Sequence, residues 1–325
     1  MKKFISFFIF ALVFCFFCLN IDGQKLESSA PTAFEKSDEL QTLVNRAADE
    51  TLAKFAAKNL KKENLSITLI DLRNPQKLTM ASFQGEEKIY PASVVKMFYL
   101  RAAQAWLEDG KIQDTPEFER GLHDMIVVSS NDATGYIVDV LSGVSDGAEL
   151  PANEFKNWAE KREQVQRHYD ALGYENINVK QKTFCEDAYG REQQFRDGGK
   201  NRNKLTTDAT ARLLTEIVLG KAVNAARSQK MMDLMKRDWE GTSTDPDDQA
   251  HGFSGIALNA MNLKGARLWS KAGWTSEDRH DAAYIETPDG LKFVLVTFTT
   301  NAANEREIIP NVAQIVLENL KTIKN

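Results

Sequence analysis

Apolar and polar positions follow two different periods in the first hundred residues after the N-terminal segment. Between residues 37 and 55 the apolar residues recur every three or four positions, which predicts an amphipathic helix. The run 65–72 (LSITLIDL) is apolar and β-branched and predicts a strand, and 76–83 is expected to pair with it across Asn74-Pro75. The apolar run from Val94 to Trp106 predicts a further helix.

The pattern is helical from about residue 100 to residue 238, apart from a long polar loop over 174–203. A loop of that length in a compact domain is usually functional or disordered. Strand patterns return near the C-terminus, at 266–273, 281–286 and 292–300. A closing helix carries apolar residues at core spacing: Val312, Ile315, Val316 and Leu320.

This order of elements predicts an α/β (α+β) fold. One antiparallel sheet is built from both chain ends and flanked by terminal helices, and an all-helical subdomain is inserted at about 100–238. The domain is expected to span residues 37–325, and the polar segment 24–36 is expected to be a flexible link.

Residues 1–23 have the character of a secretory signal peptide. Lys2 and Lys3 precede an apolar run over 4–19, which is short for spanning a bilayer. A transmembrane anchor is the alternative. Cys15 and Cys18 each follow phenylalanine, which argues against a lipoprotein cleavage site. We expect export to the periplasm or the exterior of a bacterial cell, and no membrane association after cleavage.

Composition and charge exclude several function classes. The chain of 325 residues is 42% hydrophobic and 27% charged, as in an ordinary globular protein. Its net charge of −5 and the lack of a basic cluster argue against a nucleic-acid partner. Cys185 alone would remain after signal cleavage, so a disulfide framework is excluded. The four histidines lack metal-ligand spacing, so neither a metal nor another cofactor is expected.

The segment YPASVVKMFYL, residues 90–100, places one serine and one lysine at the start of an apolar helix. Ser93 and Lys96 are three positions apart and should share a helical face. A buried lysine loses its proton easily and can then activate a hydroxyl. An ordinary helix-start serine with a solvent-directed lysine is the alternative, and partners elsewhere in the chain must decide between the two.

Two later motifs supply such partners. Ser129-Ser130-Asn131 follows an apolar helix, and Lys271-Ala272-Gly273 lies on a predicted strand. Each motif is weak alone, but S-x-x-K, S-x-N and K-x-G in this order and context are specific in combination. On these motifs the chain resembles the penicillin-recognising serine hydrolases, and within them the class A β-lactamase-like family, over roughly residues 37–325.

The resemblance implies acyl transfer. Ser93 would be the nucleophile, Lys96 would take its proton, and Ser129 would relay a proton to the leaving nitrogen. Lys271 would attract a substrate carboxylate, Asn131 would hold the substrate amide, and Gly273 would let the substrate lie along the strand. The backbone N–H groups of Ser93 and Trp274 would form the oxyanion hole.

The chain departs from the family pattern at several positions. Ser130 stands where the family has Asp, and Ala272 replaces a Thr or Ser, which removes a hydroxyl near the substrate carboxylate. Arg279 or His280 falls where the family often has a carboxylate-binding Arg, and strand alternation allows only one of them to face the site. Arg279 is the predicted substrate ligand.

The largest departure concerns deacylation. The loop motif E-x-x-L-N of class A enzymes is absent, and the loop offers Glu192 and Glu186 without the usual flanking residues. Glu192, which is nearer the helix that begins at Thr206, is the slightly favoured base. The alternative is that each of these glutamates is an ordinary solvated charge of the loop.

The predicted function is that of a secreted, monomeric serine hydrolase that hydrolyses the amide of a β-lactam ring. The alternatives are a peptidoglycan D-Ala-D-Ala peptidase or an esterase on the same fold, and a penicillin-binding sensor that does not turn over. A small β-lactam or peptidoglycan-like molecule is the expected partner.

Overall fold

The computed structural model describes residues 32–184 and 187–323. In these residues seven strands form one sheet with the order β1-β3-β2-β7-β6-β5-β4. Neighbouring strands are antiparallel, except that β1 runs parallel to β3. The strands are β1 (Glu35–Lys36), β2 (Leu65–Asp71), β3 (Thr79–Phe83), β4 (Lys236–Arg237), β5 (Arg267–Trp274), β6 (Arg279–Glu286) and β7 (Lys292–Thr299).

Both ends of the domain contribute to the centre of the sheet. β2 pairs with β7 along its whole length, from Leu65 opposite Thr299 to Asp71 opposite Phe293. Both strands are buried on the two faces, which explains why they read as apolar runs without strict alternation. The sheet predicted from the sequence is therefore confirmed.

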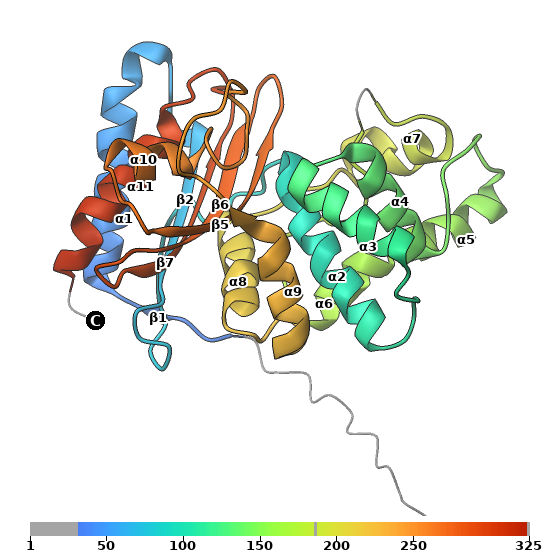
Figure 1. Cartoon of the computed structure of the whole chain (residues 1–325). Coiled ribbons are helices and arrows are strands. Elements are labelled where there is room, and N and C mark those ends of the chain that lie inside the picture. The colour runs from blue at the N-terminus through green and yellow to red at the C-terminus, as the bar shows by residue number, and fades with distance from the viewer. Residues whose placement is uncertain (1–31, 185–186, 324–325) are drawn as a thin grey trace, which may run out of the picture. The chain divides into compact units, whose positions relative to one another are not determined.

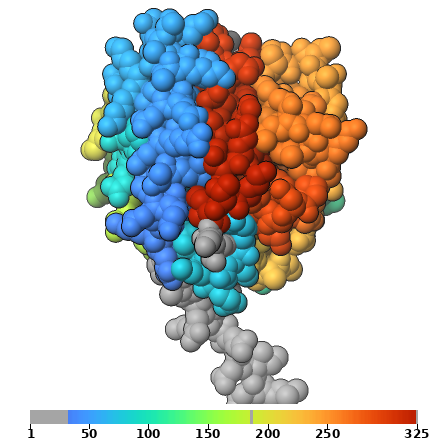
Figure 2. Space-filling model, turned by 90° about the vertical axis from the view of Figure 1, so that its left-hand side faces the viewer, coloured from blue at the N-terminus to red at the C-terminus, as the bar shows by residue number. Residues whose placement is uncertain are grey.

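The terminal helices α1 (Asp38–Lys54) and α11 (Ile308–Asn319) cover one face of the sheet. Figure 1 shows them beside the sheet, and Figure 2 shows the N-terminal and C-terminal segments side by side on that face. Val44 and Val316 belong to the same apolar cluster as Leu69 and Leu295 of the central strands. Ser37 fixes the start of α1, because its side chain accepts a hydrogen bond from the N–H of Leu40.

The opposite face packs against α8 (Thr207–Val218) and the helical subdomain (Figure 1). Val294, Val296 and Phe298 of β7 point to this side and join a second apolar cluster. The remaining helices are α2 (Lys96–Glu108), α3 (Pro116–His123), α4 (Asn131–Ser142), α5 (Ala152–Arg162), α6 (Gln164–Ala171), α7 (Gly190–Arg196), α9 (Ala225–Met235) and α10 (Ser254–Ala260).

Several local features were not predicted, among them the helix α10. β4 is a two-residue strand, and β1 lies in the segment expected to be a flexible link. The long polar loop contains α7. A single helix was expected through residue 128. Instead α3 ends at His123 and the chain continues as a π-helix, η4 (Asp124–Val128).

Among the described residues, no helix combines the length and the apolar character needed to cross a bilayer. The predicted signal peptide, residues 1–23, lies outside the described residues.

Candidate active site

Ser93 lies in a short 3-10 helix, η3 (Ala92–Val95), and Lys96 begins α2 directly after it. In a 3-10 helix the side chains at i and i+3 eclipse each other, so Ser93 and Lys96 share a face. Ala92, just before the serine, has a φ of 44°, in the left-handed region that a residue with a Cβ rarely adopts. Such strained backbone is concentrated at functional sites.

Lys96 is fully buried, and its amino group faces the segment that carries Ser129. Its Nζ donates to the carbonyl of Ser129 at 2.5 Å, to the Ser129 hydroxyl at 3.3 Å and to Oδ1 of Asn131 at 2.9 Å. The contact of Lys96 with the Ser93 hydroxyl stays a prediction. Catalytic hydrogen bonds are often long without substrate and tighten only in the complex.

Ser129 stands at the end of the π-helix η4, where its φ is 63°. Single π-helical turns frequently mark functional sites, because the extra residue redirects the chain. Ser130 then caps α4, since its hydroxyl accepts from the N–H of Ala133 at 3.1 Å. Serine and aspartate are about equally good in this position, which explains why Ser130 can replace the family's Asp.

Two lysines meet at the hydroxyl of Ser129. Lys271 of β5 donates to Ser129 Oγ at 3.0 Å, and Lys96 contacts the same oxygen at 3.3 Å. Burial, together with the charges of Lys96 and Arg237, holds the pKa of Lys271 well below its usual range. A lysine with a depressed pKa can exchange a proton with a hydroxyl near neutral pH. Ser129 is thus positioned to relay protons.

Gly273 brings β5 against the backbone of Ser93. A Cβ at this position would lie 2.7 Å from the Ser93 nitrogen and 2.8 Å from the Pro91 carbonyl oxygen. Only glycine allows the strand and η3 to approach so closely. Trp274 follows on the same strand, with its ring 5.9 Å from that of Phe253. The nucleophile and the strand predicted to hold the substrate are therefore adjacent.

Asn131 links this site to the long loop. Its Nδ2 donates to the carbonyl of Phe184 at 3.0 Å, while its Oδ1 accepts from Lys96. The structure thus joins Ser93, Lys96, Ser129, Asn131, Lys271 and Gly273 in one place.

Arg279 and His280 are placed differently from the prediction. The guanidinium of Arg279 binds Asp247 at 2.6 Å and the carbonyl of Gly252 at 2.7 Å, over the ring of Phe253. His280 is buried between the carbonyl of Tyr90 and the N–H of Thr299. Burial lowers its pKa to about 4. Because both side chains have protein partners, neither is presented to a substrate carboxylate.

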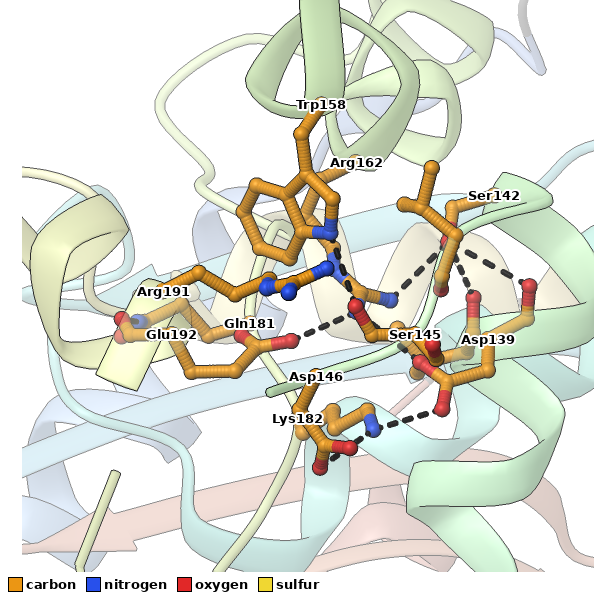
Figure 3. Close-up of polar contacts among 12 residues, drawn as sticks. Asp139, Ser142, Ser145, Asp146, Trp158, Arg162, Gln181, Lys182, Arg191 and Glu192 are labelled. Atoms are coloured by element: carbon orange, nitrogen blue, oxygen red, sulfur yellow. Dashed lines mark hydrogen bonds and ion pairs between the residues drawn. The ribbon is translucent and has the colours of Figure 1, made fainter. Parts of the chain in front are cut away.

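Glu192 lies in a buried ion cluster (Figure 3). Its carboxylate accepts from Arg162 at 2.5 Å, and Arg162 also binds Asp139 at 2.8 Å. Asp139 comes eight residues after Asn131 in α4, a rise of about 12 Å. The ion pair with Arg162 occupies one oxygen of this carboxylate, which argues against Glu192 as the water-activating base, and the assignment stays a prediction.

The same cluster fastens the long loop to the helical subdomain. Lys182 of the loop binds Asp139 at 2.7 Å and Asp146 at 3.0 Å, and the ring of Trp158 packs on Arg162. Burial raises the pKa of Glu192 despite its cationic partner. Glu186 and Cys185 lie outside the described residues, so the prediction for Glu186 stays a prediction.

Two residues at this site were missed in the sequence. Gln249 accepts from Lys271 at 2.6 Å, and Arg237 donates to the carbonyl of Ser270 at 2.8 Å. Both also donate to the carbonyl of Ile126 in η4, at 3.2 Å and 3.3 Å respectively. Gln249 lies in a polar loop whose composition gave no signal, and Arg237 lies at the end of a predicted helix.

The arrangement of residues is suited to nucleophilic acyl transfer. It offers a serine at a strained turn, two buried lysines around a second serine, and a strand edge beside the nucleophile. Within residues 32–184 and 187–323 no three His, Cys, Asp or Glu side chains converge as a metal site would require.

Solved structures of similar fold include the beta-lactamase from Sphaerobacter thermophilus DSM 20745, at 16% identity and a TM-score of 0.62 over 86% of this chain and 99% of that one. A PBP-A variant in an acyl-enzyme complex with penicillin G has 17% identity and a TM-score of 0.61, over 90% of this chain and 100% of its own. TLA-3 extended-spectrum beta-lactamase has 14% identity and a TM-score of 0.61, over 85% and 99%.

A search of curated proteins gives no match. The sequence model of the beta-lactamase enzyme family matches residues 114–320, which include Ser129, Asn131 and Lys271 but begin after Ser93 and Lys96. This match covers more than half of the chain and agrees with the fold of the solved structures. The chain therefore belongs to the beta-lactamase enzyme family.

Proposed function

We propose that this protein is a serine hydrolase that is acylated at Ser93 and hydrolyses the amide of a β-lactam ring. The observation that carries the proposal is the convergence of Lys96 and Lys271 on the hydroxyl of Ser129. A neutral amine at Lys96 can take the proton of the nucleophile, and the Ser129 hydroxyl between the two lysines can pass a proton to the departing nitrogen.

In the proposed reaction, Ser93 Oγ attacks the ring carbonyl and its proton passes to the neutral amine of Lys96. The backbone N–H groups of Ser93 and Trp274 stabilise the oxyanion, a contribution of ~10²–10³ in rate per donor. Ser129 donates its proton to the ring nitrogen as the C–N bond breaks, and the Lys96 ammonium returns a proton to Ser129. A water later hydrolyses the ester and restores the Ser93 hydroxyl. The contact of Gly273 with the Ser93 backbone supports this oxyanion geometry.

The rate of deacylation, the second step, decides whether the protein is a hydrolase or a penicillin-binding protein that stays acylated. With Glu192 committed to Arg162, Glu186 is the loop carboxylate left to be tested as the water-activating base. The acyl-enzyme named for the PBP-A variant indicates that a protein of this fold can hold the ester, so a penicillin-binding protein that turns over slowly is the second candidate.

The test is acylation by a fluorescent penicillin, followed by the mass of the intact protein. We expect one adduct, located at Ser93 and absent from Ser93→Ala, whose decay gives the deacylation rate. If neither penicillins nor activated esters label Ser93, the protein is not a serine acyl-transfer enzyme. A D-Ala-D-Ala peptide and a simple ester, run in parallel, distinguish the peptidase and the esterase.

We also propose that the protein is exported and loses residues 1–23. The charged start and the short apolar run support this. Cell fractionation and the N-terminal mass of the native protein test it; a membrane-bound chain that retains residues 1–23 would instead identify an anchor.

A further inference from the structure

All three N–H groups of the Lys271 ammonium have acceptors inside the protein. Nζ donates to Ser129 Oγ at 3.0 Å, to Gln249 Oε1 at 2.6 Å and to the carbonyl of Ala272 at 2.7 Å. An ammonium has three donors and no more. A substrate carboxylate that binds Lys271 must therefore displace one of these acceptors.

The amide oxygen of Gln249 also occupies the edge of β5. β4 pairs only with Trp269 and Leu268, so no described strand covers the edge from Ser270 to Trp274. Along this uncovered edge the N–H of Ala272 donates to Gln249 Oε1 at 3.3 Å. One oxygen atom thus accepts from a lysine ammonium and from a strand N–H, a pair of donors that suits a carboxylate oxygen.

Gln249 is held in this place from two sides. Its Nε2 donates to the carbonyls of Ile126 and Val127, at 3.2 Å and 3.0 Å, which fixes the amide with its oxygen towards Lys271. Arg279 fixes the loop that carries it, by binding Asp247 and the carbonyl of Gly252. The side chain is buried, at 8% exposed. Displacing it would break several satisfied hydrogen bonds, each of which stabilises by about 1 kcal/mol.

Two further positions that were expected to contact a substrate carboxylate do not offer a free donor. Ala272 offers a methyl group where a hydroxyl was expected, and Arg279 is committed to Asp247. We infer that Gln249 fills the carboxylate subsite of this enzyme and directs it towards substrates that are uncharged at that position. The inference rests on the proposed function, because it concerns the substrate that acylates Ser93.

The primary test compares benzylpenicillin with its methyl ester on the wild-type protein. The second-order rate of Ser93 acylation is followed by intact mass and stopped flow. A carboxylate bound by a free lysine would make the acid ~10- to 100-fold faster than the ester, from the strength of a charged hydrogen bond. We expect the ester to react at least as fast as the acid. An acid preference of ~10-fold or more would overturn the inference.

Variants of Gln249 test the mechanism. Gln249→Ala frees one donor of Lys271 and should shift the ratio towards the acid by ~10-fold. Gln249→Glu places a carboxylate in the subsite and should shift the ratio towards the ester, because it repels a charged substrate. Gln229→Ala, on the exposed side of α9, is the matched control and should leave the ratio unchanged.

The outcomes separate the two proposals. If Gln249→Ala does not fold, as judged by its melting transition, the acid-to-ester rate ratios of the wild type and of Gln249→Glu still test the inference. Ratios that do not respond to either Gln249 variant refute the inference alone. Failure of both penicillins and of an activated acyl ester to label Ser93 refutes the proposed function and the inference with it.

Discussion

Gly273→Ala should move strand β5 and the backbone of the nucleophile Ser93 apart. The added methyl group would lie 2.7 Å from the Ser93 nitrogen, 2.8 Å from the Pro91 oxygen and 2.9 Å from the Val94 nitrogen. All three atoms belong to the backbone, so no side-chain rotation can relieve the contacts. Either β5 or η3 must move.

The size of the effect follows from the distance. Ordinary van der Waals contact begins at 3.4 Å, so the shift required is the difference from 2.7 Å, ~0.7 Å. A misplacement near 1 Å can cost ~10²-fold in rate, and the loss of one oxyanion donor costs ~10²–10³. We therefore expect the rate of acylation to fall by about 10²-fold. The free energy of unfolding should decrease by ~1–3 kcal/mol, as at other overpacked positions.

Stopped-flow acylation by a fluorescent penicillin and urea unfolding measure the two effects. Gly135→Ala is the matched control, because its Cβ would lie 3.6 Å from Lys182 Cδ, in ordinary contact. Since Gly135 lies inside α4, this change should be neutral or stabilising by ~0.5–1 kcal/mol. A Gly273→Ala variant that acylates within about threefold of wild type would refute the idea that this close approach organises the site.

Further predictions concern three other positions. Lys96→Ala should abolish acylation, because it removes the proposed base, and acylation at the wild-type rate would require another base. Glu192→Gln should destabilise the fold by about 3 kcal/mol, since it leaves buried Arg162 less compensated; an accumulating acyl-enzyme with an unchanged melting temperature would instead restore Glu192 as the base. The pKa of His280 is about 4 in the folded protein and about 6.5 in the unfolded chain. Between these two pH values the imidazole is therefore protonated in the unfolded chain and neutral in the folded protein. The free energy of unfolding should therefore decrease by up to ~3 kcal/mol as the pH falls from about 6.5 to about 4. His280→Gln should flatten that part of the urea-unfolding profile, and an unchanged slope would contradict the assignment.

Local pattern was sufficient for the long strands of the sheet and for the motif residues, but not for the two-residue strands β1 and β4. The runs at 65–72 and 292–300 are apolar because β2 and β7 are buried on both faces, and they were predicted as strands for that reason. Ser93 and Lys96 are three residues apart and share one helical face, so their proximity is a local property. The prediction of the active site then needed only the order in which the S-x-N and K-x-G motifs follow along the chain.

The positions of Gln249 and Glu192 depend on tertiary packing instead. Gln249 reaches Lys271 because Arg279 and the carbonyls of η4 hold its loop, and none of these contacts is local in sequence. Glu192 was favoured as a base because it lies in the long loop. Its actual partner, Arg162, belongs to a helix thirty residues earlier. Sequence spacing cannot indicate which of two loop carboxylates faces a buried cation.

The pairing of β2 with β7 has a consequence for how the protein matures. The two strands come from nearly opposite ends of the chain, and such distant contacts slow folding because a large loop must close first. Ser93 is synthesised before Gly273, which lies against it, and before β7, which completes the sheet centre. A chain that is still being synthesised thus contains its nucleophile without the strand that organises it. Catalytic competence should therefore appear in one step, only after both β5 and β7 have been synthesised and have joined the sheet.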